Sequence, residues 1–131
     1  PGNRRVALVV GNGAYRELAT LPNPPNDARD IATALRTLDF DVTLVGDATR
    51  SEMEEKFATF AKTARTADVA IAFYAGHALQ HQEVNYLAPV DAKLSDEVDL
   101  RLKFIKVQDL IDDLQSAKGV RVLVLRYVFC V

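Results

Sequence analysis

The sequence is poor in cysteine, in long apolar runs and in net charge, and each shortage excludes a class of protein. Its 131 residues include one cysteine, which excludes an internal disulfide framework and a thiolate-rich metal site. No apolar run approaches the ~18 residues that a membrane-spanning helix needs. The net charge is −2 without a clustered basic excess, so we expect no nucleic-acid partner and no membrane partner.

The composition that is present, 49% hydrophobic and 26% charged, is typical of one soluble globular domain. The opening segment Pro1–Arg5 leads directly into a strand-like run, which predicts no signal peptide in this chain. The first residue is not Met, which suggests a trimmed N-terminus, so the sequence predicts no particular compartment.

Short β-branched apolar runs alternate with helical patterns along the chain. Asn26 is the expected N-cap of a first helix, and Ser51 and Glu54 have the capping-box spacing at the start of a second. A third helix around Leu110 ends before Gly119. Alternation of strands and helices predicts a parallel sheet with helices on both faces. Strands are expected at residues 5–10, 40–45, 68–75 and 120–125, the first and third of them buried, with a short edge strand at 85–92.

The carboxyl ends of three predicted strands should meet at one edge of this sheet, where functional groups gather. The first strand ends in Gly11-Asn12-Gly13, the third in Gly76-His77, and the fourth at Leu125. His77 directly follows a buried strand and a glycine, and a neutral imidazole is the usual proton acceptor for a Ser or Cys nucleophile. His81 lies in a polar segment and is interpreted as a solvated loop residue.

The segments FYAGHALQ and EVNYLAPVDA resemble the histidine segment of the caspase-like cysteine peptidases (family C14), in particular the bacterial metacaspase-like group. The region from the first strand to the second is also similar to that family in order and spacing. The resemblance covers residues 4–125, which we expect to be a caspase-like domain followed by a divergent tail at 126–131. It implies an α/β, caspase-hemoglobinase-like three-layer αβα sandwich with a mainly parallel sheet that lacks the C-terminal strands.

The same resemblance implies a cysteine endopeptidase that cleaves protein or peptide substrates after Arg or Lys through a Cys-His dyad, without a cofactor. His77 would be the dyad base. Ala78, where the family has glycine, would offer its backbone N–H to an oxyanion hole. Asp27 would line the pocket for the basic substrate side chain; the alternative is a helix N-terminal acid favoured by the helix dipole.

The sequence leaves the family pattern after Leu125, where the family continues with Asp-Ala-Cys-Arg or a close variant. Arg126 stands at the expected acid and Val128 at the expected cysteine. Cys130 follows two residues later, a displacement of ~6.6 Å along an extended strand that exceeds the hydrogen-bond reach of a dyad. We favour an altered, non-functional end of a truncated or frame-disrupted copy, which leaves this chain inactive. The other explanation is a tail that extends the strand, with Cys130 recruited by a partner chain or a local rearrangement.

Two other function classes stay open beside the enzyme. The first is a non-catalytic caspase-like pseudoenzyme that binds partners or basic peptides through Asp27. The second is a nucleotide-binding domain suggested by Gly11-Asn12-Gly13, which lacks the third glycine and the immediate helix of a phosphate cradle. The apolar edge of the fourth strand predicts a homodimer or a strand-exchanged assembly.

Calcium is the cofactor that the sequence leaves open. A calcium site needs about six converging oxygen ligands, and linear spacing does not show convergence. We therefore interpret the acidic residues after the edge strand as a solvated charged loop rather than a calcium site. These residues are Asp91, Asp96, Glu97 and Asp99.

Overall fold

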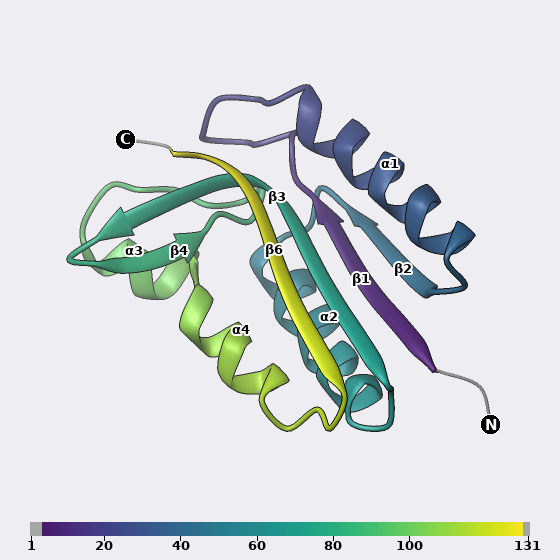
Figure 1. The fold of residues 1–131 in the computed structure, drawn as a ribbon. Helices are drawn as coiled ribbons and strands as arrows, with labels where there is room; N and C mark the ends of the chain where they lie inside the picture. The colour runs from purple at the N-terminus through teal and green to yellow at the C-terminus, as the bar shows by residue number, and fades with distance from the viewer. Residues whose placement is uncertain (1–3, 130–131) are drawn as a thin grey trace.

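The computed structural model describes residues 4–129 and is built around a six-stranded sheet (Figure 1). The strands are β1 (Arg5–Gly11), β2 (Asp41–Gly46), β3 (Val69–His81), β4 (Val84–Leu87), β5 (Ile105–Lys106) and β6 (Val120–Phe129). The helices are α1 (Asn23–Thr37), α2 (Arg50–Ala64), α3 (Val98–Lys103) and α4 (Val107–Leu114). Within the described residues, every helix falls short of the length and hydrophobicity that crossing a bilayer requires.

Long strand β3 organises the sheet because it pairs with three other strands. The order is β2-β1-β3-β4-β5, and β6 also pairs with β3. β2, β1, β3 and β6 run parallel, whereas β4 is antiparallel both to the last residues of β3 and to β5. The expected α/β fold with a mainly parallel sheet is therefore confirmed, with an antiparallel extension at one end.

Helices cover both faces of the sheet, as three layers require (Figure 1). Successive strand residues point to opposite faces, so Val9 and Phe73 pack with Ala28 of α1, while Leu8 packs with Met53 of α2 on the other face. Helix α4 joins α2 on that second face. The two clusters are the cores that hold β1 and β3 rigidly between them.

Two predicted helix starts are wrong, the first by four residues and the second by two. Helix α1 begins at Asn23, since its first turn contains two prolines that have no N–H to be capped, and the Asn26 side chain donates instead to the Pro22 carbonyl at 3.3 Å. The capping box of α2 is formed by Thr49 and Glu52, not by Ser51 and Glu54. Hydrogen bonds from the backbone N–H and then the hydroxyl of Thr49 lower the pKa of Glu52.

Other boundaries differ because pairing extends the strands. β3 does not stop at residue 75 but continues to His81, since residues 78–81 form a hairpin with β4. Its turn residues Gln82 and Glu83 both have positive φ, as a two-residue hairpin turn requires. His81 is thus a strand residue, not the predicted loop residue. Helix α3 and strand β5 were not predicted, and β5 makes β4 an internal strand rather than an edge strand.

Candidate active site at the end of β3

His77 is buried in β3, and its two ring nitrogens have different surroundings. The ring Nε2 lies 2.7 Å from the carbonyl oxygen of Ala19. A carbonyl oxygen only accepts, so Nε2 carries the proton and Nδ1 of the neutral ring is a bare acceptor. Nδ1 is buried without a hydrogen-bond partner in the part of the chain that the structure describes. The Ala19 carbonyl therefore favours the tautomer in which Nδ1 is the acceptor.

Two tyrosines hold the backbone of His77. The Tyr15 hydroxyl accepts from the His77 N–H at 2.9 Å and lies 2.9 Å from the Ala88 carbonyl oxygen, to which it donates. The Tyr74 hydroxyl donates to the His77 carbonyl at 2.7 Å. The Tyr15 and His77 rings also meet edge to face, with centroids 4.6 Å apart. Side chains from the β1–α1 connection and from β3 itself therefore position the histidine.

Gly76 is required by the close approach of these tyrosines. A Cβ atom at Gly76 would lie 2.5 Å from the Tyr74 hydroxyl and 2.6 Å from the Tyr15 hydroxyl. Both distances are shorter than non-bonded atoms tolerate, so any side chain at this position would displace the hydroxyls that bind His77. The glycine before the histidine thus serves the geometry of the site.

The Gly11-Asn12-Gly13 turn has a structural role. The Asp47 carboxylate accepts from the N–H groups of Gly13 and Ala14, each at 2.9 Å. The Asn12 side chain is fully buried and accepts from the Ala48 N–H at 2.9 Å. Backbone N–H groups that would have to cradle a phosphate are already bound by a carboxylate, which argues against the nucleotide-binding interpretation.

The register of β6 decides which residue faces His77. His77 is the cross-strand neighbour of Val128, and Ala75 is that of Arg126. Val128 is the position at which the family resemblance expects the cysteine, and Arg126 is where it expects an acid. Cys130 lies outside the described residues. In the described part of the chain, the position opposite the histidine therefore carries an apolar side chain.

Asp27, the predicted pocket residue, is in contact with Arg126, which stands at the expected acid. The guanidinium Nε of Arg126 lies 3.2 Å from the Asp27 carboxylate. The Asp27 side chain is 26% exposed and that of Arg126 is 72% exposed. Because α1 begins at Asn23, Asp27 lies beyond its first turn, where the helix dipole offers a carboxylate little stabilisation.

Ala78, the predicted oxyanion-hole residue, is buried within β3. It is the cross-strand neighbour of Leu87 in β4 on one side and of Phe129 in β6 on the other. The residue is thus held at the level of His77 by two neighbouring strands, and its role as a backbone donor stays a prediction.

The predicted acidic group has separate local partners: Asp99 accepts from the Ser95 N–H at 2.7 Å, which lowers its pKa. Glu97 lies 2.9 Å from Nε2 of His81. Asp91 accepts from the Arg50 N–H at 2.9 Å. Within residues 4–129, no group of three or more His, Cys, Asp or Glu side chains is placed to hold a metal ion.

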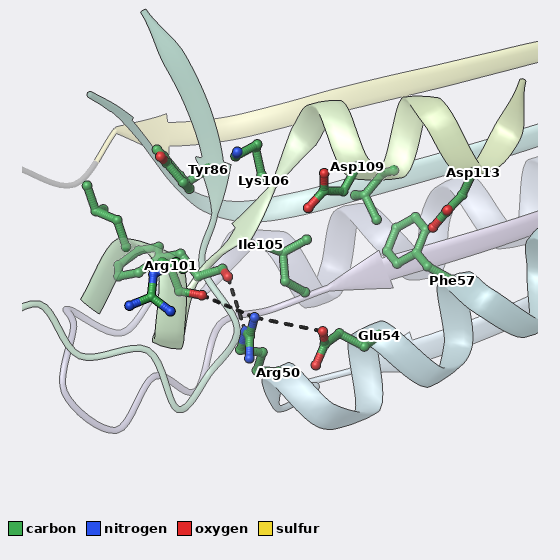
Figure 2. A pocket seen from close by; sticks show the side chains of 12 residues that line it. Arg50, Glu54, Phe57, Tyr86, Arg101, Ile105, Lys106, Asp109 and Asp113 are labelled. Carbon is green, nitrogen blue, oxygen red and sulfur yellow. Dashed lines mark hydrogen bonds and ion pairs between the residues drawn. The ribbon is translucent and has the colours of Figure 1, made fainter. Parts of the chain in front are cut away.

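A cavity of about 510 Å³ lies away from His77, among α2, α3, β5 and α4. Figure 2 shows Arg50 beside Glu54 of α2, with Asp109 and Asp113 of α4 farther along the wall of the cavity. The Arg50 guanidinium donates to the carbonyls of Phe104 and Arg101, both at 3.2 Å, and lies 3.8 Å from Glu54. Neither His77 nor Asp27 lines this cavity, so its volume does not mark the histidine site.

Comparisons with known proteins point to one family. The model of the caspase domain family (peptidase C14) matches residues 4–125. Mucosa-associated lymphoid tissue lymphoma translocation protein 1 of Homo sapiens is 34% identical over 88 residues, 67% of this chain and 11% of the relative. Its Mus musculus homolog is 33% identical over the same shares. The chain thus matches about a tenth of the length of these curated relatives.

A solved structure agrees in fold. The Drosophila initiator caspase Dronc superposes with a TM-score of 0.76 over 94% of this chain and 48% of that chain, at 14% sequence identity. The β-sheet core and its flanking helices are therefore arranged as in a caspase.

Proposed function

This chain belongs to the caspase domain family of cysteine peptidases, and from this premise we propose that it is an endopeptidase domain in which His77 is the base of a Cys-His dyad. The substrate is a protein or peptide, cleaved after Arg or Lys. The observation that carries the proposal is the fixed ring of His77, whose Nε2 is bound to the Ala19 carbonyl while its buried Nδ1 is a bare acceptor.

The ring geometry suits both proton transfers of such a reaction. Nδ1 would take the thiol proton as the sulfur attacks the substrate carbonyl carbon, and the resulting imidazolium would return that proton to the leaving amine. Water then hydrolyses the acyl-enzyme. The Ala19 carbonyl would stabilise the imidazolium through the Nε2 proton. No step requires a cofactor.

We further propose that the chain in this form is inactive, because Val128 stands opposite His77 where the thiol is needed. The test is hydrolysis of a fluorogenic Arg peptide by the wild-type chain and by His77→Ala. We expect equal background rates. Hydrolysis by the wild type that His77→Ala abolishes would overturn the inactivity and retain the peptidase.

The second candidate is a pseudoenzyme that binds basic peptides through Asp27. It is favoured by one contact, the ion pair in which Asp27 already binds a guanidinium. A chain that binds an Arg peptide, depends on Asp27 for that binding and does not cleave the peptide would select this candidate over the enzyme.

Self-association is proposed from the free side of β6. Within the described residues β6 pairs with β3 alone, and six of its apolar side chains are exposed. An exposed apolar edge strand invites pairing with another copy, so we expect a homodimer or a strand-exchanged assembly. Sedimentation velocity that shows only monomer at high concentration would contradict it. The exposed apolar residues are Val120, Val122, Val124, Tyr127, Val128 and Phe129.

A further inference from the structure

We infer that Arg126 determines specificity by occupying the Asp27 carboxylate, so that the chain's own guanidinium competes with a basic substrate side chain. The inference rests on the proposed function, in which Asp27 receives the substrate's Arg or Lys. It adds a residue that this proposal does not use, and it makes access to the basic pocket conditional on displacing Arg126.

The register places this ion pair beside the histidine. Ala75 and His77 are two residues apart in β3 and so point to the same face of the sheet. Their neighbours on β6 are Arg126 and Val128, which therefore share that face. Ala75 packs with Ala28 of α1, the residue next to Asp27. The Asp27–Arg126 contact thus lies about 6.6 Å along the strands from the His77–Val128 level.

This separation matches the division of a peptidase site into a pocket and a reacting centre. A peptide whose carbonyl lies beside His77 has to send its side chain past Arg126 to reach Asp27. The guanidinium repels an incoming cation, and it also neutralises the carboxylate that would attract that cation. Both effects lower the affinity for Arg or Lys.

Exposure makes the contact a displaceable one. The Arg126 side chain is 72% exposed, and exposed ion pairs are weak and screened by salt. Arg126 therefore lowers the affinity for a basic side chain without closing the pocket. Its effect should be largest at low ionic strength and fade as salt rises.

The test is an NMR titration of the full chain with acetyl-argininamide, which follows the backbone amide signals of Asp27 and Ala28. We expect Arg126→Ala to bind about two- to fivefold more tightly than the wild type at low salt, and the gain to shrink at high salt. Arg126→Asp should bind more tightly still, because it adds a second carboxylate beside Asp27.

The controls separate this inference from the proposed function. Arg121→Ala removes the same charge from β6 at a guanidinium that binds carbonyls near α4 instead, and it should leave binding unchanged. Acetyl-citrullinamide has the shape of the arginine probe without its charge and should not bind.

Three outcomes decide the matter. Tighter binding by Arg126→Ala that Asp27→Asn abolishes supports the inference. Equal binding by the wild type and Arg126→Ala, with loss in Asp27→Asn, overturns the role of Arg126 while the Asp27 pocket stands. Binding that is unchanged in Asp27→Asn overturns the inference and the basic pocket together.

Discussion

The strands β3 and β6 are neighbours, and their carboxyl ends lie at the same edge of the sheet. The end of β3 is closely packed, whereas the end of β6 is largely exposed. Around β3, His77 is buried, and two tyrosine hydroxyls and a carbonyl bind its polar groups. At the end of β6, Tyr127, Val128 and Phe129 are about half exposed. The Tyr127 ring contacts the Phe129 ring of the same strand, with centroids 4.7 Å apart.

This difference shows where a dyad needs support. The histidine side is positioned by residues of the β1–α1 connection, of β3 itself and of the segment after β4. At the end of β6, beyond Leu125, the described contacts are strand pairing with β3, the exposed Arg126–Asp27 ion pair and the ring contact between Tyr127 and Phe129. We therefore expect the base to be intact and the thiol position to be the part that is missing.

Val128→Cys tests this comparison with the largest expected effect. In a Cys130→Ser background, the new thiol would lie opposite His77 and lose its proton to Nδ1. We expect alkylation by iodoacetamide at pH 6.5 to be about tenfold faster than in the same chain with His77→Ala, because an unassisted thiol has a pKa of about 8.5. The rate of alkylation against pH measures the thiol pKa.

Tyr127→Cys in the same background is the matched control for Val128→Cys. It places the thiol one residue earlier, where strand alternation points it to the opposite face, and its alkylation should not depend on His77. Equal pH profiles for the two thiols would show that the end of β6 does not bring its side chains to the histidine.

Gly76→Ala tests the close packing around His77. The added Cβ would meet the Tyr74 and Tyr15 hydroxyls, so we expect a loss of about 1–3 kcal/mol in the free energy of unfolding, typical of overpacking. Gly46→Ala is the control, since a Cβ at Gly46 meets nothing within 4 Å. Urea unfolding curves measure both, and equal midpoints would contradict the close packing around His77.

The histidine half of the site could be predicted from sequence because its signals are local. Gly76 and His77 directly follow an apolar strand pattern in the sequence. Parallel strands then bring their carboxyl ends to one edge of the sheet. The ion pair of Asp27 with Arg126 could not be predicted in the same way. The resemblance implied that Asp27 lines the substrate pocket and that Arg126 stands where the family has an acid, but nothing local shows that the Arg126 guanidinium reaches α1.

Other contacts were missed because they join distant segments. Nothing in the sequence around Tyr15 indicates that its hydroxyl replaces a direct hydrogen bond between the His77 N–H and the Ala88 carbonyl. Strand β5 consists of two residues and exists through its pairing with β4, which residue propensity does not encode. The run beyond Leu125 continues as strand to Phe129 because β3 itself continues beside it.

Tyr15→Phe tests the support of His77 by removing a single oxygen atom. It removes the hydroxyl that accepts from the His77 N–H, and a buried donor without its partner costs about 1–3 kcal/mol. Tyr127→Phe is the same change on exposed β6 and should alter the free energy of unfolding by less than about 0.5 kcal/mol. Thermal or urea unfolding of the two variants compares the regions directly, and equal losses would refute the difference in support.

Val124→Thr has the smallest expected effect on the free energy of unfolding. It tests whether a second copy of the chain covers the exposed side chains of β6. Val124 is the cross-strand neighbour of buried Phe73 but is itself 41% exposed. At a micromolar concentration of the chain, we expect Val124→Thr to change the free energy of unfolding by less than about 0.5 kcal/mol. Val9→Thr, on the same face of the sheet but fully buried beneath α1, should cost about 1–3 kcal/mol because it buries a hydroxyl.

The concentration dependence of the Val124→Thr effect carries the decisive information. A second copy that covers β6 would bury Val124 only in the assembly, so the loss of stability should grow as the chain concentration rises. A loss as large as that of Val9→Thr in dilute solution would instead mean that this face is covered within one chain. In that case β3 and β6 would be equally supported, and the missing thiol alone would distinguish them.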